Sequence, residues 1–69
     1  MKEYILNIEF GNWQNQLWFM NKDTDDIQEK WQTAIKEVDS IKESSKEPIE
    51  FQDKVIDYLK GLGFIRIQK

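Results

Sequence analysis

The sequence contains neither cysteine nor histidine. Without cysteine the chain forms no disulfide and no thiolate zinc site, so its fold must rest on packing alone. Without histidine it lacks the usual general base near neutral pH, the commonest metal ligand and the relay residue of a Ser-His-Asp triad. The acids, lysines and hydroxyl residues that remain show no spacing that predicts a paired acid and base. We therefore expect no enzyme activity and no cofactor.

Long apolar runs are also missing. No stretch approaches the ~20 consecutive apolar residues of a membrane span, and the N-terminus lacks the apolar core of a signal peptide. We therefore expect a cytoplasmic protein. Nine isoleucines and nine lysines against one arginine and one alanine are typical of AT-rich coding. This composition suggests a low-GC bacterium or one of its phages.

The 69 residues leave room for one small domain, and we expect a single domain over residues 1–69. Hydrophobic residues make up 39% of the chain and nine residues are aromatic, which is enough for a core and unlike a disordered segment. The formal charge of −3 argues against broad phosphate binding, because non-specific nucleic-acid affinity comes from cationic side chains.

The N-terminal third predicts a β-hairpin. Apolar side chains recur at every second position from Tyr4 to Phe10, which is the period of a strand. Gly11 and Asn12 follow as a two-residue turn, with glycine at the position where a type II′ turn needs a positive φ. We expect strands over residues 3–10 and 13–20.

The turn also predicts the register of the hairpin, because closing it pairs Leu6 with Leu17 and Ile5 with Trp18. One face is then almost wholly apolar and is expected to face the core: Tyr4, Leu6, Ile8, Phe10, Trp13, Leu17 and Phe19. The other face carries Ile5, Asn7, Glu9, Gln14, Gln16, Trp18 and Met20.

Two helices and a short strand are expected after the hairpin. The first helix is expected over residues 25–42, where apolar residues recur at helical spacing: Ile27, Trp31, Ala34, Ile35, Val38 and Ile41. The second is expected over residues 48–60, with an apolar stripe that extends to Leu62: Phe51, Val55, Tyr58, Leu59 and Leu62. Gly61 or Gly63 would cap the second helix, and residues 64–68 form a last strand. The order β-β-α-α-β predicts a small α+β domain with a three-stranded sheet and two helices on one face. The position of the last strand in the sheet stays open.

The outer sheet face is the first candidate site. Trp18 lies opposite Ile5 in the predicted register, with Met20 beside them and polar residues around, which is the composition of a protein-binding hot spot. If Ile65 and Ile67 turn to the core, Phe64 and Arg66 join Trp18 on this face. The alternatives are burial of Trp18 in a homodimer or under the end of the chain, and stacking of single-stranded nucleic acid, which the negative charge disfavours.

The second candidate site is acidic. From Glu37 to Asp57 there are seven acidic residues and three lysines, and the acidic surface that we consider comprises Glu43, Glu47, Glu50, Asp53 and Asp57. Such a run is usually a solvated helix face, but it can also imitate a phosphate backbone.

No metal site is expected. Asn21, Asp23 and Asp25 have the spacing that opens a calcium loop, but Asp26 and Gln32 stand where that loop needs glycine and glutamate.

These features favour a non-enzymatic protein-binding module, with a homodimer or assembly subunit as the alternative. The partner itself stays unidentified. By size and composition alone, the chain invites comparison with small phage and prophage inhibitors, including anti-CRISPR proteins, but no motif carries that analogy.

Overall fold

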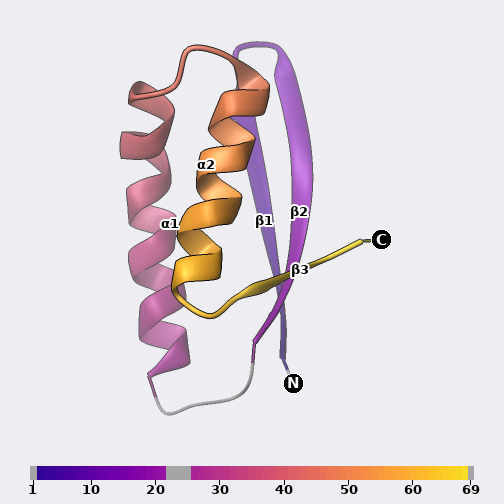
Figure 1. Ribbon diagram of the computed structural model, residues 1–69, viewed down its shortest axis with the longest axis vertical. Helices are drawn as coiled ribbons and strands as arrows, with labels where there is room; N and C mark the ends of the chain where they lie inside the picture. The colour runs from indigo at the N-terminus through magenta and orange to yellow at the C-terminus, as the bar shows by residue number, and fades with distance from the viewer. Residues whose placement is uncertain (1, 22–25, 69) are drawn as a thin grey trace.

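The computed structural model describes residues 2–21 and 26–68 and shows the predicted α+β order, β-β-α-α-β. Figure 1 labels its elements: strands β1 (Lys2–Phe10) and β2 (Trp13–Asn21), helices α1 (Ile27–Glu43) and α2 (Pro48–Gly61), and strand β3 (Ile65–Ile67). Within the described residues, neither helix combines the length and apolar character needed to cross a membrane.

The hairpin forms as its turn predicts. Gly11 has a φ of 61°, and no described residue other than glycine has a positive φ, so Asn12 keeps the ordinary sign. This combination is that of a type II′ turn. The predicted register is confirmed, with Leu6 opposite Leu17 and Ile5 opposite Trp18.

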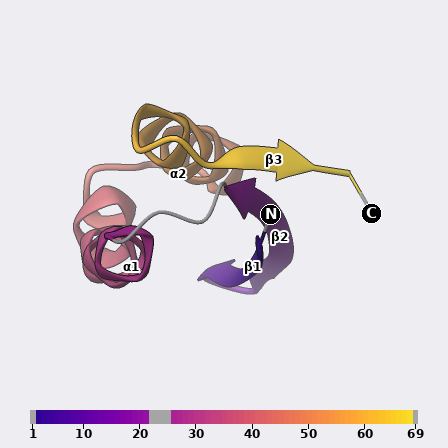
Figure 2. The same ribbon diagram turned by 90° about the horizontal axis from the view of Figure 1, so that it is seen from below.

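Strand β3 pairs with β2 and not with β1. It runs antiparallel to β2, with Ile67 opposite Trp18 and Ile65 opposite Met20. The sheet is therefore antiparallel throughout, in the order β1-β2-β3. Figure 2 shows both helices on one side of this sheet, with α1 toward β1 and α2 toward β3.

The core lies between the helices and the inner face of the sheet. Its centre is aromatic: the Tyr4 ring lies 4.9 Å from the Trp31 ring, and the Phe64 ring lies 5.2 Å from each of them. The buried apolar residues are Tyr4, Leu6, Ile8, Leu17, Phe19, Ile27, Trp31, Ala34, Phe51, Val55, Leu59 and Phe64. All of the expected inward residues of the hairpin belong to this core except Phe10 and Trp13, which are half-buried against it.

Helix α1 differs from the expected pattern at one position. Ile35 is 45% exposed, although its spacing placed it on the buried stripe with Trp31 and Val38. It stands at the edge of that stripe, where the helix turns toward solvent. An ion pair between Asp26 and Lys30 (3.6 Å) joins the first turn. Of the calcium-like spacing, Asp23 and Asp25 lie outside the described residues.

Helix α2 ends in a Schellman motif. Gly63 has a φ of 96° and donates its N–H to the carbonyl of Lys60, while the N–H of Phe64 bonds the carbonyl of Leu59. This motif brings the residue after the glycine against the last buried turn of the helix. Leu59 and Phe64 are each 1% exposed, so the helix end directs Phe64 into the core.

Candidate functional site

The outer face of the sheet carries apolar side chains from all three strands. Residues that pair across antiparallel strands project to the same face. The register therefore places Ile5, Trp18 and Ile67 in one row, and Met20 beside Ile65 in the next row. We call these five residues the outer apolar patch.

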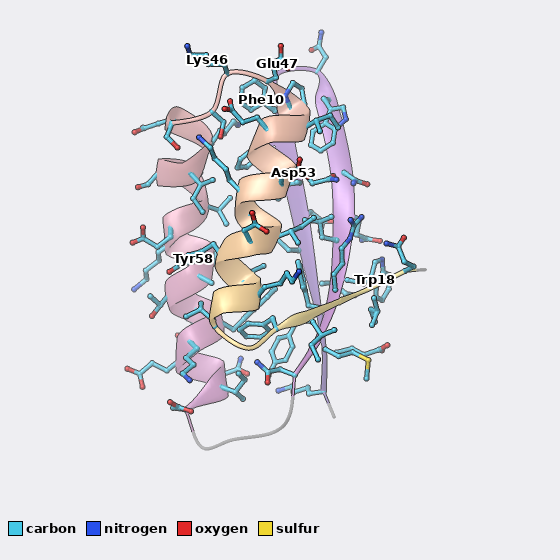
Figure 3. The ribbon with its side chains drawn as sticks, viewed as in Figure 1. Phe10, Trp18, Lys46, Glu47, Asp53 and Tyr58 are labelled. Carbon is cyan, nitrogen blue, oxygen red and sulfur yellow. The ribbon has the colours of Figure 1, made fainter. Side chains whose placement is uncertain are left out.

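The patch is open to solvent on the side away from the helices. Ile5 is 46% and Ile65 is 58% exposed, and Trp18, Met20 and Ile67 are half-buried. Figure 3 shows the Trp18 side chain directed away from the helices, beside β3. A tryptophan that is packed by neighbours and still reachable from outside is a typical anchor of protein interfaces.

Polar side chains surround the patch. Toward the hairpin tip, the Gln16 side-chain amide donates a hydrogen bond to Asn7 Oδ1 (3.0 Å). Glu9 and Gln14 form the next cross-strand pair, and Glu3 lies opposite Met20. An apolar centre with a polar border is the composition of the interior and rim of a binding surface.

Two of the residues predicted for this face are placed elsewhere. Phe64 is 1% exposed in the core, and Arg66 lies opposite Phe19, on the inner side of the sheet. The expectation that Phe64 and Arg66 would join Trp18 is therefore wrong. The physical reason is the Schellman motif, which turns Phe64 inward and so turns the next residue outward.

The residues that sequence reasoning missed are Ile65 and Ile67. Both sides of the last strand are apolar enough to be buried, so alternation alone does not choose between them. A usable signal lies just before the strand: Leu59 and Phe64 have the spacing of the hydrophobic contact that accompanies a Schellman glycine.

This correction also weakens the nucleic-acid reading of the face. Sequence-tolerant binding of single strands uses several aromatic side chains in a positively charged groove. With Phe64 in the core, Trp18 is the one aromatic side chain on the outer face among the described strand residues. Arg66, the one arginine of the chain, lies on the other side of the sheet.

The second candidate, the acidic surface, is exposed but not continuous. Its members Glu43, Glu47, Glu50, Asp53 and Asp57 are all exposed; Figure 3 labels Glu47 between the helices and Asp53 on α2. Glu50 is engaged in structure, because it accepts the Lys46 backbone N–H (2.6 Å) and lies 3.8 Å from Lys54. The lysine in turn donates to the Ser44 carbonyl (2.9 Å).

The same contacts act on the charge of Glu50. The hydrogen bond from the Lys46 backbone, aided by the positive charge of Lys54, lowers the pKa of Glu50 below its ordinary value of 4.5. From the first turn of α2, this carboxylate holds the backbone just before the helix, and its negative charge lies at the positive end of the helix dipole. We interpret the acidic surface as a solvated helix face with one structural carboxylate.

Among the described residues, no group of three or more acidic side chains is arranged to hold a metal ion. No known protein family, no curated protein and no solved structure matches this chain.

Proposed function

We propose that this chain is a non-enzymatic protein-binding module that contacts its partner through the outer apolar patch. The observation that carries the proposal is the continuity of Ile5, Trp18 and Ile67 across three strands, on the sheet face that no helix covers. Five neighbouring apolar side chains differ from the scattered apolar residues that any surface shows.

The surface area favours a folded monomer that binds a partner over an obligate dimer. The chain exposes 4835 Å², close to the roughly 4,600 Å² expected for a monomeric protein of its mass. An obligate protomer carries a larger apolar face, because stable dimers bury about 800 Å² or more on each partner.

The proposed mode of action is stoichiometric. A module with a preformed patch and no catalytic residues can only occupy a surface of its partner, which is how small inhibitors and adaptors work. A phage-type inhibitor, including an anti-CRISPR-like role, is the form of this proposal that the size and composition suggest.

The test compares three proteins as affinity baits: the wild type, Ile65→Asp and Gln14→Asp. Both substituted side chains are exposed on the outer face, but only Ile65 belongs to the patch. We expect a partner that the wild type and Gln14→Asp retain and that Ile65→Asp loses. The purified pair should then form a complex of fixed stoichiometry.

Sedimentation of the wild type alone tests the dimer alternative. We expect a mass near the 8.4 kDa of one chain. A stable dimer that Ile65→Asp dissociates would contradict the proposal and support a structural homodimer. Equal partner retention by all three baits would remove the patch from the contact. Trp18→Ala serves as a further variant once its folding has been checked by circular dichroism.

A further inference from the structure

The outer edge of β1 is the longest unpaired strand edge of the described sheet. A two-residue turn makes Phe10 and Trp13 a hydrogen-bonded pair, and such pairs alternate with non-bonded ones along the hairpin. The backbone groups of Ile5, Asn7 and Glu9 therefore point away from β2. Among the described residues, no hydrogen bond engages these groups from outside the hairpin.

The two open edges of the sheet differ in how they are protected. Strand β3 pairs only with residues 18–20 of β2, so the edge of β2 is open at Gln16. There the N–H of Gln16 donates to Asn15 Oδ1 (2.9 Å), and Asn15 Nδ2 donates to Gln52 Oε1 of α2 (2.6 Å). Strand β1 has no such cover. Its register runs through nine pairs without a bulge, and the strand contains no proline; its charged residues, Lys2, Glu3 and Glu9, lie near its two ends. Bulges, prolines and charged side chains usually block edge pairing, and the middle of the strand, from Tyr4 to Ile8, has none of them.

A groove lies along this edge, between β1 and the second half of α1. It has a volume of about 810 Å³, and both hairpin strands and both helices line it: Asn7, Ile8 and Glu9 of β1, Gln14, Asn15 and Gln16 of β2, Val38, Asp39 and Lys42 of α1, and Phe51 of α2. Successive residues of a strand point to opposite faces. The lining therefore includes both faces of the hairpin, and because α1 lies toward β1, the groove passes along the edge of β1. We call it the α1–β1 groove.

The groove begins where the helix and the strand separate. Near the start of β1 the two are joined, because Lys2 Nζ donates to Gln28 Oε1 (3.3 Å) and the rings of Tyr4 and Trp31 lie 4.9 Å apart. Farther up, Ile35 of α1, which precedes Val38 by one helical turn, is 45% exposed.

We propose that the α1–β1 groove binds an extended segment of a partner protein, which adds to β1 as a further strand. Such a segment would satisfy the outward groups of Asn7 and Glu9 by backbone hydrogen bonds, as in other cases of strand addition. Its inward side chains would cover Val38, since Ile8 is already buried. Helix α1 forms the far side of the groove.

The rim of the groove defines the chemistry of the segment. Glu9 and Asp39 are exposed carboxylates, against the one amine of Lys42. Of the apolar lining residues, Ile8 and Phe51 are buried and Val38 is half-buried, so Val38 offers most of the apolar contact. The segment that fits alternates small β-branched residues with polar ones and carries a lysine or arginine. This contact uses the backbone edge of Ile5, whereas the outer apolar patch uses the Ile5 side chain, and it does not depend on the proposed function.

The experiment uses the full chain and a capped peptide probe, Thr-Val-Lys-Val-Thr-Val-Lys. In the free protein, the amides of Ile5, Asn7 and Glu9 should exchange with solvent at least ~10-fold faster than those of Leu6 and Ile8. Millimolar peptide should slow the exchange of these three amides and shift their NMR signals. A copy of the peptide that is methylated on every backbone nitrogen should not bind.

Two matched variants locate the contact. Ile35→Ser should weaken peptide binding at least ~3-fold, because it removes apolar surface beside the groove. Ile49→Ser changes an isoleucine that is 57% exposed on α2 and should leave binding unchanged. Ile65→Asp should also leave binding unchanged, although it abolishes the contact at the outer apolar patch.

Three results would overturn the proposal: no binding at millimolar peptide, equal binding of the methylated copy, or amides at Ile5, Asn7 and Glu9 that are already protected in the free protein. If Ile65→Asp abolished peptide binding, the peptide would instead bind at the outer apolar patch.

Discussion

Substitution of Phe64 by alanine should destabilise the protein far more than the same substitution at its neighbour, Ile65. The two side chains have opposite environments, since Phe64 is 1% and Ile65 is 58% exposed. The Phe64 ring lies 5.2 Å from the rings of both Tyr4 and Trp31. The comparison therefore measures which side of the last strand faces the core.

The magnitude follows from burial. Truncation of a buried phenylalanine to alanine costs about 3–5 kcal/mol, which includes the cavity left between the rings. A domain of this length has a total stability of roughly 3–10 kcal/mol, so Phe64→Ala removes a large part of it or all of it. Ile65→Ala loses little burial and some strand propensity, which together amount to less than about 1 kcal/mol.

Urea titration followed by circular dichroism and tryptophan fluorescence gives the free energy of unfolding. Because Phe64→Ala is expected to be partly unfolded without denaturant, Phe64→Leu provides a measurable intermediate, with a loss of about 1–1.5 kcal/mol. If Ile65→Ala cost as much as Phe64→Ala, the inward orientation of Phe64 and the membership of Ile65 in the outer apolar patch would both be refuted.

Four further substitutions test the turn, the two ends of α2 and the closed edge of β2. Gly11→Ala should lower the melting temperature, at a cost of about 1–2 kcal/mol, because its φ of 61° is unfavourable for an L-residue with a side chain. Gly61→Ala, inside α2 with no atom within 4 Å of the added methyl, should raise stability by ~0.5–1 kcal/mol. If Gly11→Ala and Gly61→Ala shifted the melting temperature in the same direction, the difference between the two glycines would be contradicted. Glu50→Gln should be less stable than the wild type at neutral pH, because the Lys46 N–H lowers the pKa of the Glu50 carboxylate in the folded protein. The gap between their free energies of unfolding should close as the pH falls below 4.5, because protonation removes the advantage of the carboxylate. Urea titrations at several pH values measure the gap, and a constant gap would exclude the ionic contribution. Asn15→Val removes the side chain that covers the β2 edge and should increase self-association, measured by light scattering at high protein concentration, whereas unchanged scattering would show that the edge is protected otherwise.

The candidate site was predictable in part. Ile5, Trp18 and Met20 follow from the hairpin register, because residues of one parity share a face once the turn is placed. The other two members of the patch, Ile65 and Ile67, required knowledge of where the last strand pairs and how it leaves α2. The edge of β1 likewise has no sequence signal of its own, since being an edge is a property of the sheet order.

By itself, the sequence determined the features that depend on neighbours along the chain. Gly11 permits the tight turn, alternation assigns the two faces of the hairpin, and the apolar spacing produces both helices, because each of these follows from local backbone geometry. Only the tertiary structure decided that β3 lies beside β2, that Phe64 fills the core between Tyr4 and Trp31, and that α1 leaves a groove beside β1. These choices rest on contacts between residues far apart in the sequence, where several arrangements satisfy the same local pattern and packing selects one.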